Sequence, residues 1–141
     1  MNILPKALTA LLTLAALAPV SAALTAPTPL ATIQLDSRWD DSLGYDALYT
    51  ECAWQGLALP AEARAALGDP ARITLTAEDL PDHVQVALRP ARNSGLIGLS
   101  VSRTDQTRSV HQMGRLTLSN PQTGYSYTVQ ALIVGDERAK K

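Results

Sequence analysis

The residues whose types and spacing best suit chemistry are His111 and Met113, which flank Gln112 in a segment that alternates like a strand. Residues two apart on a β-strand point to the same face of the sheet, so the imidazole and the thioether would lie side by side. Copper accepts both kinds of ligand. The pair therefore raises the hypothesis of a small copper-handling protein with His111 and Met113 as metal ligands.

The His-x-Met spacing resembles the second half of the copper motif in periplasmic copper chaperones, which are also small exported β-sandwiches. That family has a further His and Met upstream. In this chain the only other methionine is Met1, and His83 has no methionine beside it. Because the number of ligands decides whether a metal is held, we favour an ordinary strand position for the pair and expect no cofactor.

Arginine is concentrated in the middle of the chain, where residues 89–115 contain one acid, Asp105, and no lysine. The planar guanidinium suits bidentate contact with carboxylates, phosphates or sulfated sugars. Alternatively, such charges lie at strand ends and edges, where they prevent unwanted sheet pairing. The sequence does not indicate whether the side chains converge. The predicted binding patch consists of Arg89, Arg92, Arg103 and Arg115.

No recognisable catalytic motif accompanies these residues. The chain has no Gly-x-Ser-x-Gly elbow, no Ser-x-x-Lys, no His-Glu-x-x-His and no phosphate loop. Its single cysteine, Cys52, cannot form an internal disulfide, and we expect a buried thiol or an intermolecular disulfide. We therefore expect a protein that is not an enzyme, with an enzyme assembled from distant loops as the alternative.

Five acids crowd residues 36–51, where the one basic residue is Arg38. Carboxylates on a turn can hold calcium. The spacing does not match the calcium-loop pattern, however. A solvated turn is the simpler interpretation.

The elements that would position these residues are strands. Residues 95–135 form three alternating runs separated by short turns, which is typical of an antiparallel meander. In residues 83–89 the pattern places His83 and Arg89 outward. Residues 60–68 start with proline, are rich in alanine and end with glycine, so they predict one short helix. The other strands are expected at 32–39, 47–59 and 72–77.

This pattern predicts an all-β fold, an antiparallel β-sandwich of immunoglobulin/fibronectin type with about seven strands and one short helix. The segment from Leu118 to Val129 resembles the Leu-x-Pro-x-Thr-x-Tyr-x-Val motif of fibronectin type III domains, with one residue inserted before Pro121 and a repeated tyrosine. The resemblance implies a tyrosine near a strand corner. Tyr125 or Tyr127 would then serve the fold rather than a ligand.

The N-terminus is typical of a secretory signal. Lys6 is followed by an apolar run, and Val20-Ser21-Ala22 fits the small-x-small cleavage rule. The run is short for a membrane-spanning helix, which needs about 20 apolar residues; a retained anchor is the alternative. The expected organisation is a signal peptide at 1–22, a proline-containing linker or edge segment at 23–31, the sandwich at 32–135 and a charged tail at 136–141.

The formal net charge of −1 gives no electrostatic reason to expect nucleic-acid binding. We expect an exported protein, periplasmic or extracellular, with no transmembrane segment once the signal is removed. The favoured function is a non-enzymatic binding or structural module of the cell envelope. It would recognise a protein or glycan partner through a sheet face or edge.

Overall fold

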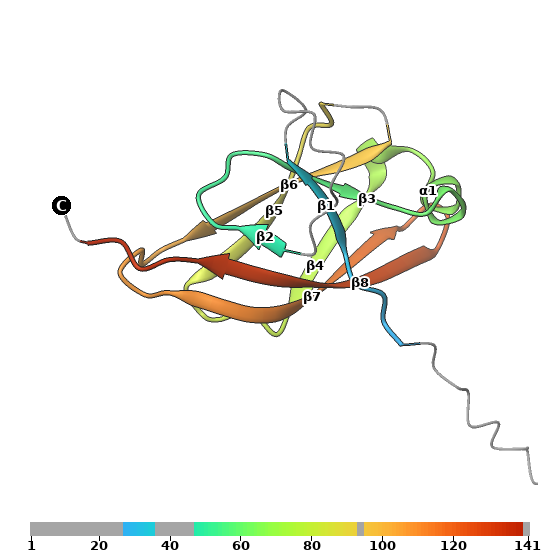
Figure 1. Cartoon of the computed structure of the whole chain (residues 1–141). Helices are drawn as coiled ribbons and strands as arrows, with labels where there is room; N and C mark the ends of the chain where they lie inside the picture. The colour runs from blue at the N-terminus through green and yellow to red at the C-terminus, as the bar shows by residue number, and fades with distance from the viewer. Residues whose placement is uncertain (1–26, 36–46, 93–94, 140–141) are drawn as a thin grey trace, which may run out of the picture.

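The computed structural model describes residues 27–35, 47–92 and 95–139, which form two four-stranded sheets and one α-helix (Figure 1). The all-β sandwich with one short helix is therefore confirmed, with eight strands among the described residues. The finer immunoglobulin/fibronectin assignment stays a prediction. The first sheet has the order β1 (Thr32–Leu35), β3 (Gln55–Ala58), β6 (Leu96–Arg103), β5 (Val84–Arg89). The second has the order β2 (Ala47–Tyr49), β8 (Tyr125–Gly135), β7 (Val110–Asn120), β4 (Thr74–Glu78).

The strand expected at 47–59 is in fact two strands in different sheets. β2 pairs in parallel with β8, whereas β3 pairs antiparallel with β1 and β6. Glu51 lies between them with a φ of 60°, a left-handed conformation that interrupts a pleated strand. The chain therefore crosses from one sheet to the other in residues 50–54.

The predicted helix is confirmed as α1 (Ala61–Leu67), preceded by Pro60 and followed by Gly68 with a φ of 72°. Leu67 is buried, and its carbonyl accepts a hydrogen bond of 2.6 Å from Asn120 Nδ2 at the end of β7. α1 is thereby docked where β7 turns into β8 (Figure 1). A 3₁₀ turn, Pro70–Arg72, delays the next strand, so β4 starts at Thr74.

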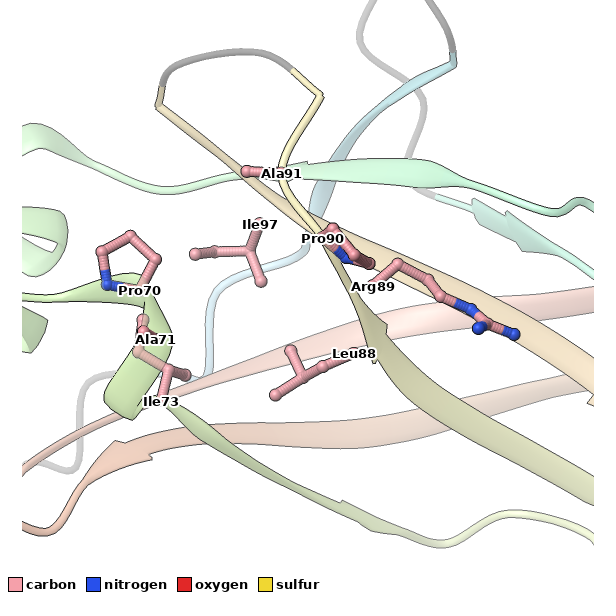
Figure 2. Close-up of a pocket in the computed structure, with 8 residues that line it drawn as sticks. All are labelled: Pro70, Ala71, Ile73, Leu88, Arg89, Pro90, Ala91 and Ile97. Atoms are coloured by element: carbon pink, nitrogen blue, oxygen red, sulfur yellow. The ribbon is translucent and has the colours of Figure 1, made fainter.

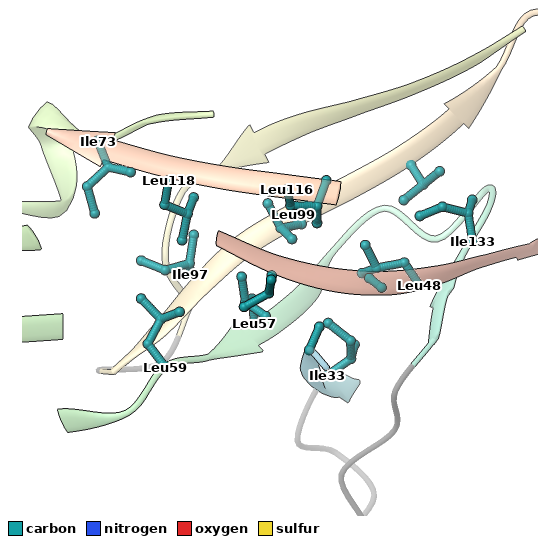
Figure 3. Close-up of a cluster of buried hydrophobic side chains, with 14 of the residues drawn as sticks. Ile33, Leu48, Leu57, Leu59, Ile73, Ile97, Leu99, Leu116, Leu118 and Ile133 are labelled. Carbon is teal, nitrogen blue, oxygen red and sulfur yellow. The ribbon is translucent and has the colours of Figure 1, made fainter. Parts of the chain in front are cut away.

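The core consists of the inward side chains of both sheets, as the alternating pattern predicts (Figure 3). Because the chain has no phenylalanine, leucine, isoleucine, valine and alanine fill the centre, and Tyr125 and Tyr127 pack partly buried against it. Both tyrosines lie in β8, where they contribute to the fold. The largest fully buried aliphatic side chains are Ile33, Leu48, Leu57, Leu67, Leu99, Leu116, Leu118, Ile133 and Val101.

Several predictions concern residues outside the described part of the chain. These are the signal peptide, the acidic turn within 36–46 and the last two residues of the tail. In the described end of the proposed linker, Ala31 N donates to Gln130 O at 2.7 Å and Gln130 N to Pro29 O at 2.9 Å, so this segment lies extended along β8. No helix in the described ranges is long and apolar enough to cross a membrane.

Candidate binding site

The four arginines of the predicted patch do not share one surface. Arg89 ends β5 and Arg92 follows in the next loop, whereas Arg103 ends β6 with a buried side chain. Arg115 belongs to β7 of the other sheet, with its Nη1 3.8 Å from Glu78 Oε2 on β4. Arg89 and Arg92 are therefore the two members that lie together.

Arg103 is held in an internal ion pair. Its Nε donates to Glu51 Oε1 at 2.8 Å and its Nη2 to Glu51 Oε2 at 2.9 Å, while Nη1 donates to the Arg108 carbonyl at 2.8 Å. The Arg103 side chain is 0% exposed and that of Glu51 15%. This hydrogen bonding lowers the pKa of Glu51 against the opposing effect of burial. A buried, bidentate guanidinium of this kind is part of the fold and not of a ligand site.

Arg89 and Arg92 lie beside Trp54, which is the residue directly before β3. Trp54 Nε1 donates to the Pro90 carbonyl at 3.0 Å, and the Arg92 guanidinium carbon is 5.5 Å from the centre of the indole ring. A cation at that distance over an aromatic face is attracted to the ring. Arg89 Nε donates to Ser100 Oγ at 2.9 Å, which fixes its side chain against β6. Both arginines are thus positioned by specific contacts.

A pair of glycines allows the indole to lie this close to the sheet. Gly56 and Gly98 are opposite each other on β3 and β6, and each alternates with core residues, so both face away from the core. A Cβ on Gly98 would lie 2.5 Å from Trp54 Nε1 and 2.6 Å from the Arg89 carbonyl oxygen. On Gly56 it would lie 2.9 Å from the far edge of the indole. Trp54 therefore covers the outer face of the first sheet.

Two hollows adjoin these residues and share Arg89, Pro90 and Ala91. The larger one, which we call the arginine pocket, has a volume of about 410 Å³ and is lined by Ala53, Trp54, Arg89, Pro90, Ala91 and Arg92. The smaller one, of about 200 Å³, is apolar and is lined by Pro70, Ala71, Ile73, Leu88, Arg89, Pro90, Ala91 and Ile97 (Figure 2). Figure 2 shows the Arg89 guanidinium pointing away from Pro70 and Ile73, so its stem alone borders the apolar hollow. Among the residues that the structure describes, the lining of the two hollows contains no acid.

The chain matches no protein-family model, no curated protein and no solved structure. The chemistry of the arginine pocket is therefore argued from its geometry.

His111 and Met113 are both exposed on β7, opposite Val134 and Leu132 of β8. In the ranges that the structure covers, no three His, Cys, Asp or Glu side chains are grouped so as to hold a metal. The structure thus adds no further ligand of these kinds to the pair. Copper binding there stays a hypothesis.

The prediction that His83 faces outward is wrong, because its side chain is 5% exposed. His83 precedes Val84, the first residue of β5, in a turn where Val84 N donates to the Pro81 carbonyl at 3.0 Å. The alternation of the strand therefore does not yet apply to it. Its Nδ1 lies 3.5 Å from Asp82 Oδ1, too far for a good hydrogen bond, and neither ring nitrogen has a hydrogen-bond partner among the described residues.

Cys52 lies in the crossing between β2 and β3 and not in a strand. The free thiol is half-buried, and its Sγ donates to the Trp54 carbonyl at 3.3 Å. The thiol is thus part of the turn that presents Trp54.

Sequence reasoning missed the roles of Trp54, Pro90 and the two glycines. A single strand over 47–59 would put Trp54 on one face with Leu48 and Cys52, whereas the crossing between the sheets moves it to the outside of the first sheet. One signal was available. Glycine inside a strand often marks the close approach of another group, and Gly98 lies within such an alternating run.

Proposed function

We propose that the protein is a non-enzymatic binding module of the cell envelope, exported to the periplasm or beyond, whose arginine pocket holds an anionic group of a protein or glycan partner. The observation that carries the proposal is that Arg89 and Arg92, held by Ser100 and by the indole of Trp54, border the same hollow of about 410 Å³. Export itself rests on the signal-like N-terminus.

The surroundings of the two arginines support this assignment. Guanidinium groups bind carboxylates, sulfates and phosphates through paired hydrogen bonds. Arg92 is oriented by the indole of Trp54 and Arg89 by Ser100. Side chains that are already ordered lose less conformational freedom when a ligand binds. The apolar surfaces of Pro90 and Ala91 would contact the uncharged part of the same partner.

The strand order favours an immunoglobulin-like module. In immunoglobulin constant domains one sheet has the order A-B-E-D and the other contains C, F and G. The order β1-β3-β6-β5 corresponds to the first, and β4-β7-β8 to the second, with β2 as an additional edge strand. Such a fold raises the prior for binding, but function has to be argued from the site.

The test measures how long the protein is retained on immobilised polygalacturonate, dextran sulfate and neutral dextran. The Arg89→Ala/Arg92→Ala double variant should bind the anionic supports at least about tenfold more weakly, since charged hydrogen bonds contribute about 1.5–3 kcal/mol each. Arg115→Ala/Arg138→Ala is the matched control, because it removes the same charge elsewhere on the surface.

The control should retain most of the binding of the wild-type chain, and neutral dextran should retain none of the three proteins. An equal loss in both double variants would mean that retention follows net charge alone. That result would remove the arginine pocket as a binding site.

A further inference from the structure

β5 is an edge strand of the first sheet, because the order β1-β3-β6-β5 leaves one of its sides unpaired among the described residues. The edge strands of the two sheets are β1, β5, β2 and β4, and β5 is the longest of them. Residues 84–88 contain neither proline nor a charged side chain, which are two of the features that protect sheet edges. This edge is therefore open to pairing with another extended chain.

The hydrogen bonds around β5 identify which main-chain groups face the free edge. Thr104 N donates to the His83 carbonyl at 2.9 Å, so the main chain of His83 faces β6. Val84 N instead donates into the preceding turn at 3.0 Å, outside the β5–β6 ladder. Because the direction alternates along an antiparallel pair, the N–H and C=O groups of Val86 and Leu88 face the free edge. In the described ranges no backbone group pairs with them there.

The two faces of β5 differ in their chemistry. Val86 and Leu88 point inward and pack partly buried against the core. The apolar hollow of about 200 Å³ adjoins this inward face, where Leu88 and Ile73 lie across it from each other (Figure 2). On the outward face the Arg89 guanidinium points away from the hollow, and its Nε donates to Ser100 Oγ. Successive side chains of a strand point to opposite faces, so a strand added here would have one side chain toward the hollow and the next beside the guanidinium.

We propose that β5 is the docking edge for an extended peptide segment of a partner protein, in which an aliphatic residue and an acidic residue are adjacent. The segment pairs with the main chain of Val86 and Leu88, places the aliphatic side chain in the apolar hollow and sets the carboxylate beside Arg89. In such strand addition the main-chain hydrogen bonds give affinity, and the pockets for alternate side chains give specificity. The inference rests on the proposed function, since Arg89 borders both hollows.

The observations favour a peptide over the other occupants. A peptide strand carries N–H and C=O groups at the same two-residue spacing as the free groups of β5, and a glycan does not. The single guanidinium on the outward face complements one carboxylate, whereas the hollow on the inward face suits an uncharged side chain. A second copy of β5 does not fit this arrangement, because residues 84–89 contain no acid to place opposite Arg89.

Fluorescence anisotropy with labelled peptides of the length of β5 tests the inference on the full chain. The first peptide alternates valine and glutamate, and the second has the same residues in two blocks. The third repeats the first with N-methyl groups on two adjacent central residues. The second and third should bind at least about tenfold more weakly than the first, because the blocks do not separate the two faces and the N-methyl groups remove main-chain hydrogen bonds.

Substitutions in β5 separate the main-chain contribution from the charge contribution. Val86→Pro removes an N–H from the free edge and leaves the β5–β6 ladder intact, so binding of the alternating peptide should fall about threefold or more. Val86→Ala keeps the N–H and is the matched control. Arg89→Glu should reverse the preference, from the valine–glutamate peptide to an alternating valine–lysine peptide. Circular dichroism checks that each variant is folded.

Equal affinity for the alternating, block and N-methylated peptides overturns the inference, as does equal binding by Val86→Pro and Val86→Ala. A dimer in analytical ultracentrifugation that Val86→Pro abolishes would mean that a second copy occupies the edge, which also overturns it. If no peptide binds while polygalacturonate is still retained, the peptide edge is wrong and the proposed function stands. If neither is bound, both are wrong.

Discussion

Arg103 and Arg89 lie at opposite ends of the β5–β6 hairpin, and the same guanidinium group has opposite surroundings at each end. Arg103 pairs in register with Val84, and Arg89 pairs with Gly98. Arg103 is fully buried against Glu51, whereas Arg89 is exposed at the edge of the arginine pocket. The two ends therefore show how one residue type is part of the buried fold in one place and is exposed at the surface in another.

The two arginines differ in burial because they lie on opposite faces of the first sheet. Arg103 follows Leu99 and Val101 on the inward face of β6, so its charge leaves water when the sandwich closes. A buried charge is costly unless an opposite charge and hydrogen bonds accompany it. Glu51 supplies both from the crossing between the sheets, in a left-handed conformation that few non-glycine residues adopt. Arg89 is on the outward face and needs no such partner.

The largest effect should come from removing the inward arginine. Arg103→Ala leaves the mostly buried Glu51 carboxylate without its partner, and we expect the free energy of unfolding to fall by about 3–5 kcal/mol. Arg89→Ala should change it by no more than about 0.5–1 kcal/mol, as for other surface substitutions. Urea denaturation at neutral pH measures both, and similar losses in the two variants would contradict the distinction between the two ends.

Much of this comparison was predictable from the alternation of residues 96–103. Ile97, Leu99 and Val101 face inward, and the same parity places Arg103 inward and out of reach of a ligand. Parity applies only within a strand, however. The alternation does not hold for His83, which lies one residue before β5. It is also interrupted between β2 and β3, where Glu51 has a left-handed conformation. The sequence therefore predicts strand faces well and the residues at strand ends poorly.

The arginine pocket was less accessible to sequence reasoning, because it depends on contacts between distant segments. Arg89 and Arg92 are near each other in the chain, but Trp54 reaches Pro90 across 36 positions. Gly56 and Gly98 become neighbours only through the pairing of β3 with β6. Register between strands is set by packing of the whole sandwich, and a single sequence does not state it.

A methyl group added under the indole should disturb the arginine pocket with an intermediate effect. Gly98→Ala places a Cβ 2.6 Å from the Arg89 carbonyl oxygen, a backbone atom that moves only with the strand, so we expect a loss of about 1–3 kcal/mol in unfolding free energy. Retention on polygalacturonate should fall with it, because Trp54 and the 89–92 segment must shift. Ser102→Ala changes an exposed outward residue of the same strand and should leave both measurements near the wild-type values. If Gly98→Ala behaves like Ser102→Ala, the glycine pair does not position the site.

The smallest effect should be a change in acid sensitivity at the buried end. Hydrogen bonding from Arg103 holds the pKa of Glu51 below its usual value of 4.5, whereas the unfolded chain titrates near that value. Between the lowered pKa and 4.5 the unfolded state binds more protons than the folded state, so stability rises with pH in that window. Glu51 therefore contributes fully to the stability of the fold above pH 4.5 and loses this contribution as the pH falls through the lowered pKa.

Glu51→Gln should lower stability at neutral pH and flatten the decline of stability on acidification, as measured by urea denaturation from neutral to acidic pH. Asp82→Asn is the matched control: the pKa of Asp82 is also lowered, through Arg108, but this carboxylate is exposed and its pair is screened by water, so the acid profile should stay close to that of the wild type. A wild-type slope in Glu51→Gln would mean that the buried pair is not the group that senses acid.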